Sequence, residues 1–194
     1  MKYRNLIAIV VAVVVLCAAS VLFAGQYLSN GCLWWECAPE RGFHVLDWEI
    51  PISLLPSGSF TDHITAPTDN MVGEIEGGLQ TIYVDQGIVI YDIYRFPRTK
   101  DAVEEFEHNK RNMIDRNTGT TWQVPANLTF SSKTADDSYI ACGYWSNRYR
   151  CQMTAQYQEF VVFLNADIND KMTFDQFEKV SFYVDAQLSS RLYP

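Results

Sequence analysis

The stretch that decides the fold is residues 139–156, YIACGYWSNRYRCQMTAQ. Its two halves alternate as β-strands do, and they meet at Ser146-Asn147, a two-residue loop in which Asn tolerates a positive φ. This loop places Cys142 opposite Cys151 and predicts an antiparallel hairpin. The turn alone sets this register, and the register also pairs apolar residues on that face. Ile140 lies opposite Met153, and Tyr144 lies opposite Tyr149.

The cysteines predict two structural disulfides. Counting from the turn puts Cys142 and Cys151 in a non-hydrogen-bonded pair, where Cα atoms approach to about 4.5 Å, which suits a cross-strand disulfide. Cys32 and Cys37 form the second pair, since an even number in an oxidising compartment indicates disulfides. Free core thiols are one alternative. A zinc site is disfavoured because neither spacing gives Cys-x2-Cys, and redox catalysis because a mid-strand pair lacks an exposed thiolate.

An uncharged run from Leu6 to Ala24 precedes the rest of the chain and can span a membrane as one helix. Lys2 and Arg4 lie before this run, and the first basic residue after it is Arg41. The positive-inside rule therefore predicts a cytoplasmic N-terminus and an extracytoplasmic domain. We expect residues 1–25 to be a single-pass signal-anchor that contacts the membrane through residues 6–24, with Cys17 as a small apolar residue of the span.

A cleaved signal peptide is the competing interpretation of this run. Residues 6–16 make a good hydrophobic region, and Ala18-Ala19-Ser20 offers small residues for cleavage. The apolar continuation to Ala24 favours the anchor, as do Tyr27, Trp34 and Trp35 where the lipid interface would follow.

Length and composition restrict the class of protein. The chain has 194 residues, 48% of them hydrophobic, which is enough for one domain with a sizeable core. Removing Lys2 and Arg4 leaves 13 basic against 23 acidic residues beyond position 25, so the surface would repel nucleic acid. No second long apolar run exists, which excludes a multi-span transporter.

Residues 26–78 and residues 79–194 differ in pattern. The first segment is interrupted by four prolines and Gly77-Gly78, and we interpret it as an irregular tether and cover segment whose apolar patches pack on the domain or at the lipid surface. The second is the extracytoplasmic α+β domain. Its first strands are residues 79–84 and 88–96, joined by a three-residue turn with Gly87 in the left-handed conformation.

Helices and further strands follow in the second segment. Thr99 caps a helix to about Asp115, and a short strand lies near Leu128. After the cysteine hairpin comes a strand over residues 159–166. A capping box at Thr173-x-x-Gln176 starts the last helix, with a staple between Met172 and Phe177. The buried stripe of that helix is Phe177, Val180, Val184 and Leu188.

This order predicts a mainly antiparallel sheet with two helices packed on it, an α+β fold preceded by one transmembrane helix. We expect the helices on one face and the cover segment on the other. From Leu79 to Leu192 the order of elements resembles small secreted bacterial lipoprotein-like domains of the Mog1/PsbP type. That resemblance implies an antiparallel sheet flanked by helices and implies no activity.

The sequence assigns no catalytic, cofactor-binding or metal-binding residue. His44, His63 and His108 are dispersed, and no phosphate or dinucleotide loop is present. A count from Asp167 to Glu178 resembles a calcium loop, but Lys171 occupies a ligand position and Met172 replaces the glycine, which favours a strand-to-helix turn.

Asp92 stands alone within an apolar strand. Such an acid either is buried for a purpose or faces a polar notch. We expect the notch, with Tyr94 or Arg95 nearby.

Three functions remain open. The favoured one is a non-catalytic, membrane-anchored module that binds a protein or other ligand. The others are an accessory subunit of a larger membrane complex and an extracytoplasmic enzyme with dispersed carboxylates.

Overall fold

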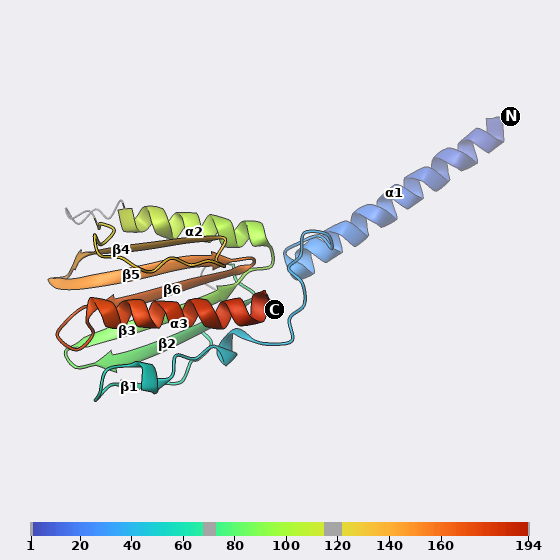
Figure 1. Ribbon diagram of the computed structural model, residues 1–194. Coiled ribbons are helices and arrows are strands. Elements are labelled where there is room, and N and C mark those ends of the chain that lie inside the picture. Colours follow the sequence, from blue (N-terminus) through green and yellow to red (C-terminus); the bar gives the residue numbers. More distant parts are fainter. Residues whose placement is uncertain (1, 68–72, 115–121, 194) are drawn as a thin grey trace. The chain divides into compact units, whose positions relative to one another are not determined.

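The computed structural model describes residues 2–67, 73–114 and 122–193, and the chain divides into two compact units. Unit 1 is Met1–Pro39 and unit 2 is Glu40–Pro194. Unit 1 holds the N-terminal helix, and unit 2 holds a sheet with two helices (Figure 1).

Unit 1 is built on one long helix, α1 (Lys2–Asn30). Its section Ile7–Asn30 is long and apolar enough to cross a membrane, judged by length and composition. Gly25 does not end the helix, because one interior glycine costs only about 1 kcal/mol. The helix ends instead at Gly31, which has a φ of 69° and donates its N–H to the carbonyl oxygen of Tyr27 at 2.9 Å. This is a left-handed C-cap.

Among its described residues, unit 2 is organised around a six-stranded sheet in the order β1-β2-β3-β6-β5-β4. All neighbouring strands are antiparallel, which confirms the predicted α+β fold. The strands are β1 (Phe60–Thr61), β2 (Glu76–Val84), β3 (Gly87–Arg95), β4 (Asp137–Trp145), β5 (Arg148–Tyr157) and β6 (Phe160–Asp167).

The helices α2 (Thr99–Ile114) and α3 (Phe174–Leu192) lie on opposite faces of this sheet, so our expectation that both cover one face is wrong. In β6, Val161 packs with Phe106 of α2, whereas Val162 packs with Val180 of α3. Successive residues of a strand point to opposite faces. Helix periodicity shows that one side of a helix is buried, but it does not show which face of the sheet buries it. We call the two sides the α2 face and the α3 face.

The cover segment packs at the β2 side of the α3 face and contains two short 3-10 helices, η1 (Val45–Asp47) and η2 (Ile52–Leu54). Val45, Trp48 and Ile50 belong to the same buried cluster as α3. The Gln80 side chain accepts from the Ile50 N–H at 2.8 Å and donates to the Ile50 carbonyl at 3.1 Å. Both backbone polar groups of the buried Ile50 are thereby satisfied.

The hairpin of β4 and β5 has the predicted register. Cys142 pairs with Cys151, and the turn residues Ser146 and Asn147 have φ values of 48° and 65°. Two consecutive left-handed residues match the twist of the flanking strands.

The hairpin of β2 and β3 differs from the prediction. Val84 pairs with Gly87, so the turn has two residues, and Gln86 rather than Gly87 takes the positive φ, at 59°. Gly87 is needed for a different reason. A Cβ atom at this position would lie 2.9 Å from Nδ2 of Asn169, which crosses close to the strand.

The prediction of a short strand near Leu128 is also wrong. Leu128 donates its N–H to the Pro125 carbonyl at 3.1 Å in a turn. The isolated bridge of this region lies earlier, between Gln123 and Cys142. The apolar side chain of Leu128 packs on the main core from this turn.

The start of α3 forms half of the predicted capping box. Thr173 accepts from the backbone N–H of Gln176 at 3.2 Å, but the Gln176 side chain donates to the Leu54 carbonyl of the cover segment. Met172 and Phe177 are both buried in the main core, as the staple predicts. Asp115, the predicted end of the preceding helix, lies outside the described residues.

Candidate functional site

A cleft of about 940 Å³ lies where the β2–β3 turn, the start of β5 and the turn before α3 come together. We call it the hairpin cleft. Its lining includes Phe60, Tyr83, Asp85, Gln86, Arg148 and Lys171. None of these was assigned to a site by the sequence, because they come from segments far apart in the chain.

An aromatic pair forms one part of the lining. Phe60 of β1 is the register partner of Tyr83 of β2, and their rings stack with centroids 4.6 Å apart and an interplanar angle of 14°. Both rings reach solvent, since Phe60 is 60% exposed and Tyr83 is 38% exposed. Stacked exposed rings offer a flat apolar surface to a ligand.

An ion cluster forms the second part. Asp167 is buried and accepts from Nη1 of Arg148 and from Nε of Arg150, each at 2.7 Å, while the Ile88 N–H lies 3.3 Å away. Burial alone would raise the pKa of Asp167, but the two arginine hydrogen bonds outweigh it and hold the pKa below its usual value. Asp167 therefore fixes Arg148 at the cleft as a cation.

Lys171 supplies a second cation from the turn before α3. Asn169 shapes this turn, because its Oδ1 accepts the N–H groups of Lys171 and Met172 at 2.8 Å each. Its Nδ2 donates to the Asp85 carbonyl at 3.1 Å and joins the turn to the β2–β3 hairpin. In the part of the chain that the structure describes, the exposed Lys171 ammonium has no ion-pair partner.

The contacts of Asp167 and Glu178 overturn the calcium-loop alternative. Asp167 is taken by two arginines, and Glu178 instead accepts the N–H groups of Thr129 and Phe130 at 2.6 and 2.7 Å. The segment is the strand-to-helix turn that the sequence favours. Over residues 2–67, 73–114 and 122–193, no group of three His, Cys, Asp or Glu residues could hold a metal ion.

The three histidines are not brought together. His44 lies 3.6 Å from Glu76, His63 lies 3.2 Å from Glu49, and the exposed His108 contacts Asn112 one turn along α2.

Asp92 lies half-buried on the α2 face, between Leu79 of β2 and Phe163 of β6. Arg95 cannot form the expected notch with it, because an odd spacing in a strand places the two side chains on opposite faces. Arg95 instead lies 3.1 Å from Glu76. Burial raises the pKa of Asp92 to about 7.

A buried ion cluster at the β5–β6 turn escaped the sequence analysis. Glu159 is fully buried, and both its oxygens accept from Arg41 of the cover segment at 2.8 Å. Arg95 lies 3.5 Å from the same carboxylate. Sequence spacing gives no signal for a pair separated by more than half of the chain. The cluster joins the cover segment to the sheet.

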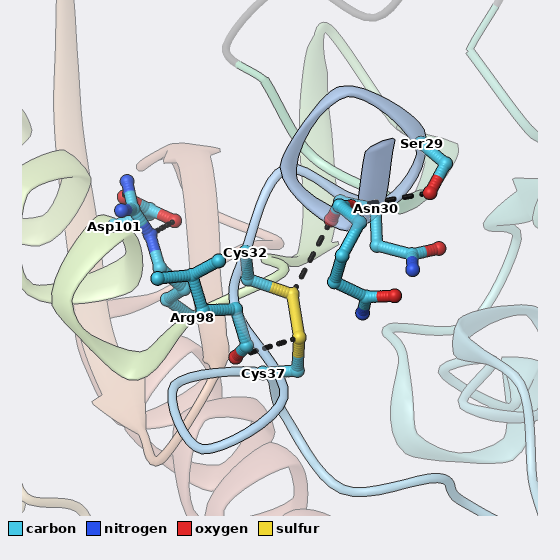
Figure 2. Close-up of a disulfide and its surroundings, with 8 residues drawn as sticks. Ser29, Asn30, Cys32, Cys37, Arg98 and Asp101 are labelled. Atoms are coloured by element: carbon cyan, nitrogen blue, oxygen red, sulfur yellow. Dashed lines mark hydrogen bonds and ion pairs between the residues drawn. A yellow bond between two sulfur atoms is a disulfide. The ribbon is translucent and has the colours of Figure 1, made fainter. Parts of the chain in front are cut away.

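The predicted cysteine pairs lie at disulfide distance. In unit 2, the Sγ atoms of Cys142 and Cys151 are 2.00 Å apart, with Cα atoms 4.1 Å apart, in the α3-face core. In unit 1, those of Cys32 and Cys37 are 2.06 Å apart (Figure 2). Cys17 is a free, exposed cysteine of α1.

Comparisons with known proteins add little to this description. No family model matches the chain, and no curated protein matches it. Among solved structures, the chain is similar to the extracellular domain of PknH from Mycobacterium tuberculosis, at 12% identity and a TM-score of 0.39. The match covers 68% of this chain and 84% of that one.

Proposed function

We propose that this protein is a non-catalytic, membrane-anchored extracytoplasmic module whose ligand binds in the hairpin cleft. The observation that carries the proposal is the lining of the cleft, where the stacked rings of Phe60 and Tyr83 share one hollow with the cations of Arg148 and Lys171. This lining fits a ligand that combines an anionic group with a flat apolar or ring-shaped surface.

Binding is favoured over catalysis by the kinds of side chain in the cleft. Its described lining includes no histidine and no cysteine, which are the commonest general base and the most nucleophilic side chain. The buried Asp167, which accepts from Arg148 at the cleft, is held ionised by two arginines and has no free role as a proton donor.

The orientation in the membrane is part of the proposal. The uncharged length of α1 supports a single span, and Lys2 and Arg4 at its start support a cytoplasmic N-terminus. The cysteine pairs at disulfide distance are typical of an oxidising compartment on the other side.

The binding site is tested with the full chain in lipid nanodiscs and phenyl phosphate as the probe, because this small molecule carries both a ring and an anionic group. Saturation-transfer NMR should detect binding of phenyl phosphate and weaker binding of phenol. Lys171→Gln and Phe60→Ala should each raise the dissociation constant about fivefold, which corresponds to a loss of roughly 1 kcal/mol of binding free energy.

Lys179→Gln is the matched control, since it removes the same charge from an exposed position of α3 outside the described lining of the cleft. It should leave the affinity unchanged. Equal affinity in wild type, Lys171→Gln and Phe60→Ala would show that the cleft is not the binding site.

A further inference from the structure

The loop closed by Cys32 and Cys37 carries two exposed tryptophans. We call residues 32–37 the tryptophan loop. Trp34 is 56% exposed and Trp35 is 67% exposed. Large aromatic side chains are rarely left so open side by side without a binding partner.

The tryptophan loop folds back along α1. The rings of Trp34 and Trp35 contact the ring of Phe23 edge-on, with centroids 5.7 and 5.9 Å apart. Phe23 lies seven residues before the last helical residue, Asn30. At a rise of 1.5 Å per residue, the tryptophans return about 10 Å toward the apolar part of the helix.

Three local features hold the loop in this position. The left-handed Gly31 reverses the chain directly after α1, and the Cys37 N–H donates to the Leu33 carbonyl at 3.1 Å. The Cys32–Cys37 pair then closes the loop (Figure 2). The return of the tryptophans to Phe23 is therefore built into unit 1.

The depth of Phe23 identifies what the tryptophans meet. If the hydrocarbon core begins at Leu6, where the uncharged run begins, about 20 residues of helix cross its roughly 30 Å and reach Gly25. Phe23 then lies within about 5 Å of the outer hydrocarbon boundary. Tryptophan is enriched at this depth, because its ring is apolar and its indole N–H can bond to headgroups and water.

We propose that the tryptophan loop is a lipid-docking element that inserts Trp34 and Trp35 into the headgroup region of the outer leaflet. The inference rests on the proposed membrane anchoring of α1. It adds a second contact with the bilayer, from a loop outside the transmembrane helix, and this contact fixes the depth at which α1 sits.

The test uses the full chain in phosphatidylcholine vesicles, with and without lipids brominated at acyl carbons 6 and 7, which quench tryptophan near the interface. The chain has five tryptophans, so bromination should quench about two fifths of the emission. The double variant Trp34→Phe/Trp35→Phe should lose this quenching. Trp145→Phe, a half-buried tryptophan of β4, is the matched control and should retain it.

Two kinds of measurement distinguish failure of the lipid-docking loop from failure of the membrane anchoring on which it rests. Intact mass and resistance to carbonate extraction report whether residues 1–25 are retained in the membrane. A retained chain whose Trp34 and Trp35 emission is quenched by aqueous acrylamide but not by brominated lipid would overturn the docking loop alone. A soluble chain that begins near Ser20 or Val21 would overturn the anchoring itself.

Discussion

The two faces of the sheet are built from different side chains. On the α3 face, the buried residues that β3, β5 and β6 contribute are apolar apart from Arg95 at the end of β3. They include Val89, Tyr91, Met153, Val162 and Leu164. On the α2 face the same strands place buried Gln152 and Thr154, and half-buried Asp92 and Asn165, beside a smaller apolar cluster.

This difference indicates that the α3 face supplies most of the stability, whereas the α2 face tolerates buried polar groups. The α3 face buries one continuous core that includes α3 and part of the cover segment. The α2 face is divided into two small clusters, one around Phe106 and one around Trp122. We therefore expect truncation of a buried apolar side chain on the α3 face to cost much more free energy of unfolding than removal of a buried hydroxyl on the α2 face.

The largest expected effect is that of Leu164→Ala on the α3 face. This side chain is fully buried, so its truncation should lower the free energy of unfolding by about 4 kcal/mol in urea titrations. Thr154→Val is the comparison on the α2 face. The Thr154 hydroxyl is buried with no hydrogen-bond partner among the described residues, so this variant should stay within about 1 kcal/mol of wild type. Similar losses in both variants would contradict the division between the faces.

A smaller effect is expected from the cysteine pair on the α3 face. Replacing Cys142 and Cys151 together by Ala opens a loop of about ten residues and should cost about 2 to 3 kcal/mol, seen as a lower Tm. The double variant Cys32→Ala/Cys37→Ala is the control, since that pair lies in unit 1 and should leave the Tm of unit 2 unchanged. Free Cys142 and Cys151 thiols in non-reducing peptide mapping, or linkage of either to Cys32 or Cys37, would contradict this structural pairing.

The smallest effect is a pH dependence on the α2 face. Burial raises the pKa of Asp92 from 3.8 to about 7, so the folded state holds this proton more tightly than the unfolded state. The contribution to stability is complete below about pH 4 and is lost as the pH rises through about 7. Asp92→Asn should therefore be more stable than wild type by about 1 kcal/mol at pH 8, and this advantage should disappear at pH 4.

Asp85→Asn, at the exposed β2–β3 turn, is the control for this pH dependence. Thermal unfolding should show the same pH profile in Asp85→Asn as in wild type. An Asp92→Asn profile that runs parallel to wild type between pH 4 and pH 8 would mean that the carboxyl of Asp92 is fully hydrated.

The parts of this fold that sequence could predict are those encoded by neighbouring residues. The Ser146-Asn147 turn sets the β4–β5 register and hence the pairing of Cys142 with Cys151, because both strands are adjacent to it in sequence. The cap at Thr173 is local in the same way. The prediction for the β2–β3 turn is partly wrong. Propensity places glycine at the left-handed position, but Gln86 takes that position, and the glycine stands one residue later at Gly87, close to Asn169.

The parts that could not be predicted depend on distant residues. The placement of α2 and α3 on opposite faces follows from which side of β6 each helix buries, and amphipathicity is the same in both cases. The hairpin cleft joins Phe60, Tyr83, Arg148 and Lys171 from four separate segments. No local pattern distinguishes these four from ordinary surface residues.

The pairing of β3 with β6 has a consequence for how the chain reaches this structure. β2 and β3 form a hairpin early in synthesis, but the neighbour of β3 is β6, which follows two further strands, β4 and β5. Until β6 is made, the backbone edge of β3 has no partner strand. The apolar side chains of Val89, Tyr91 and Ile93 wait longer still, because the helix that covers their face is α3. Long-range antiparallel pairing of this kind is slow, so the nascent N-terminal half should depend on chaperones for longer than the contiguous β4–β5–β6–α3 half.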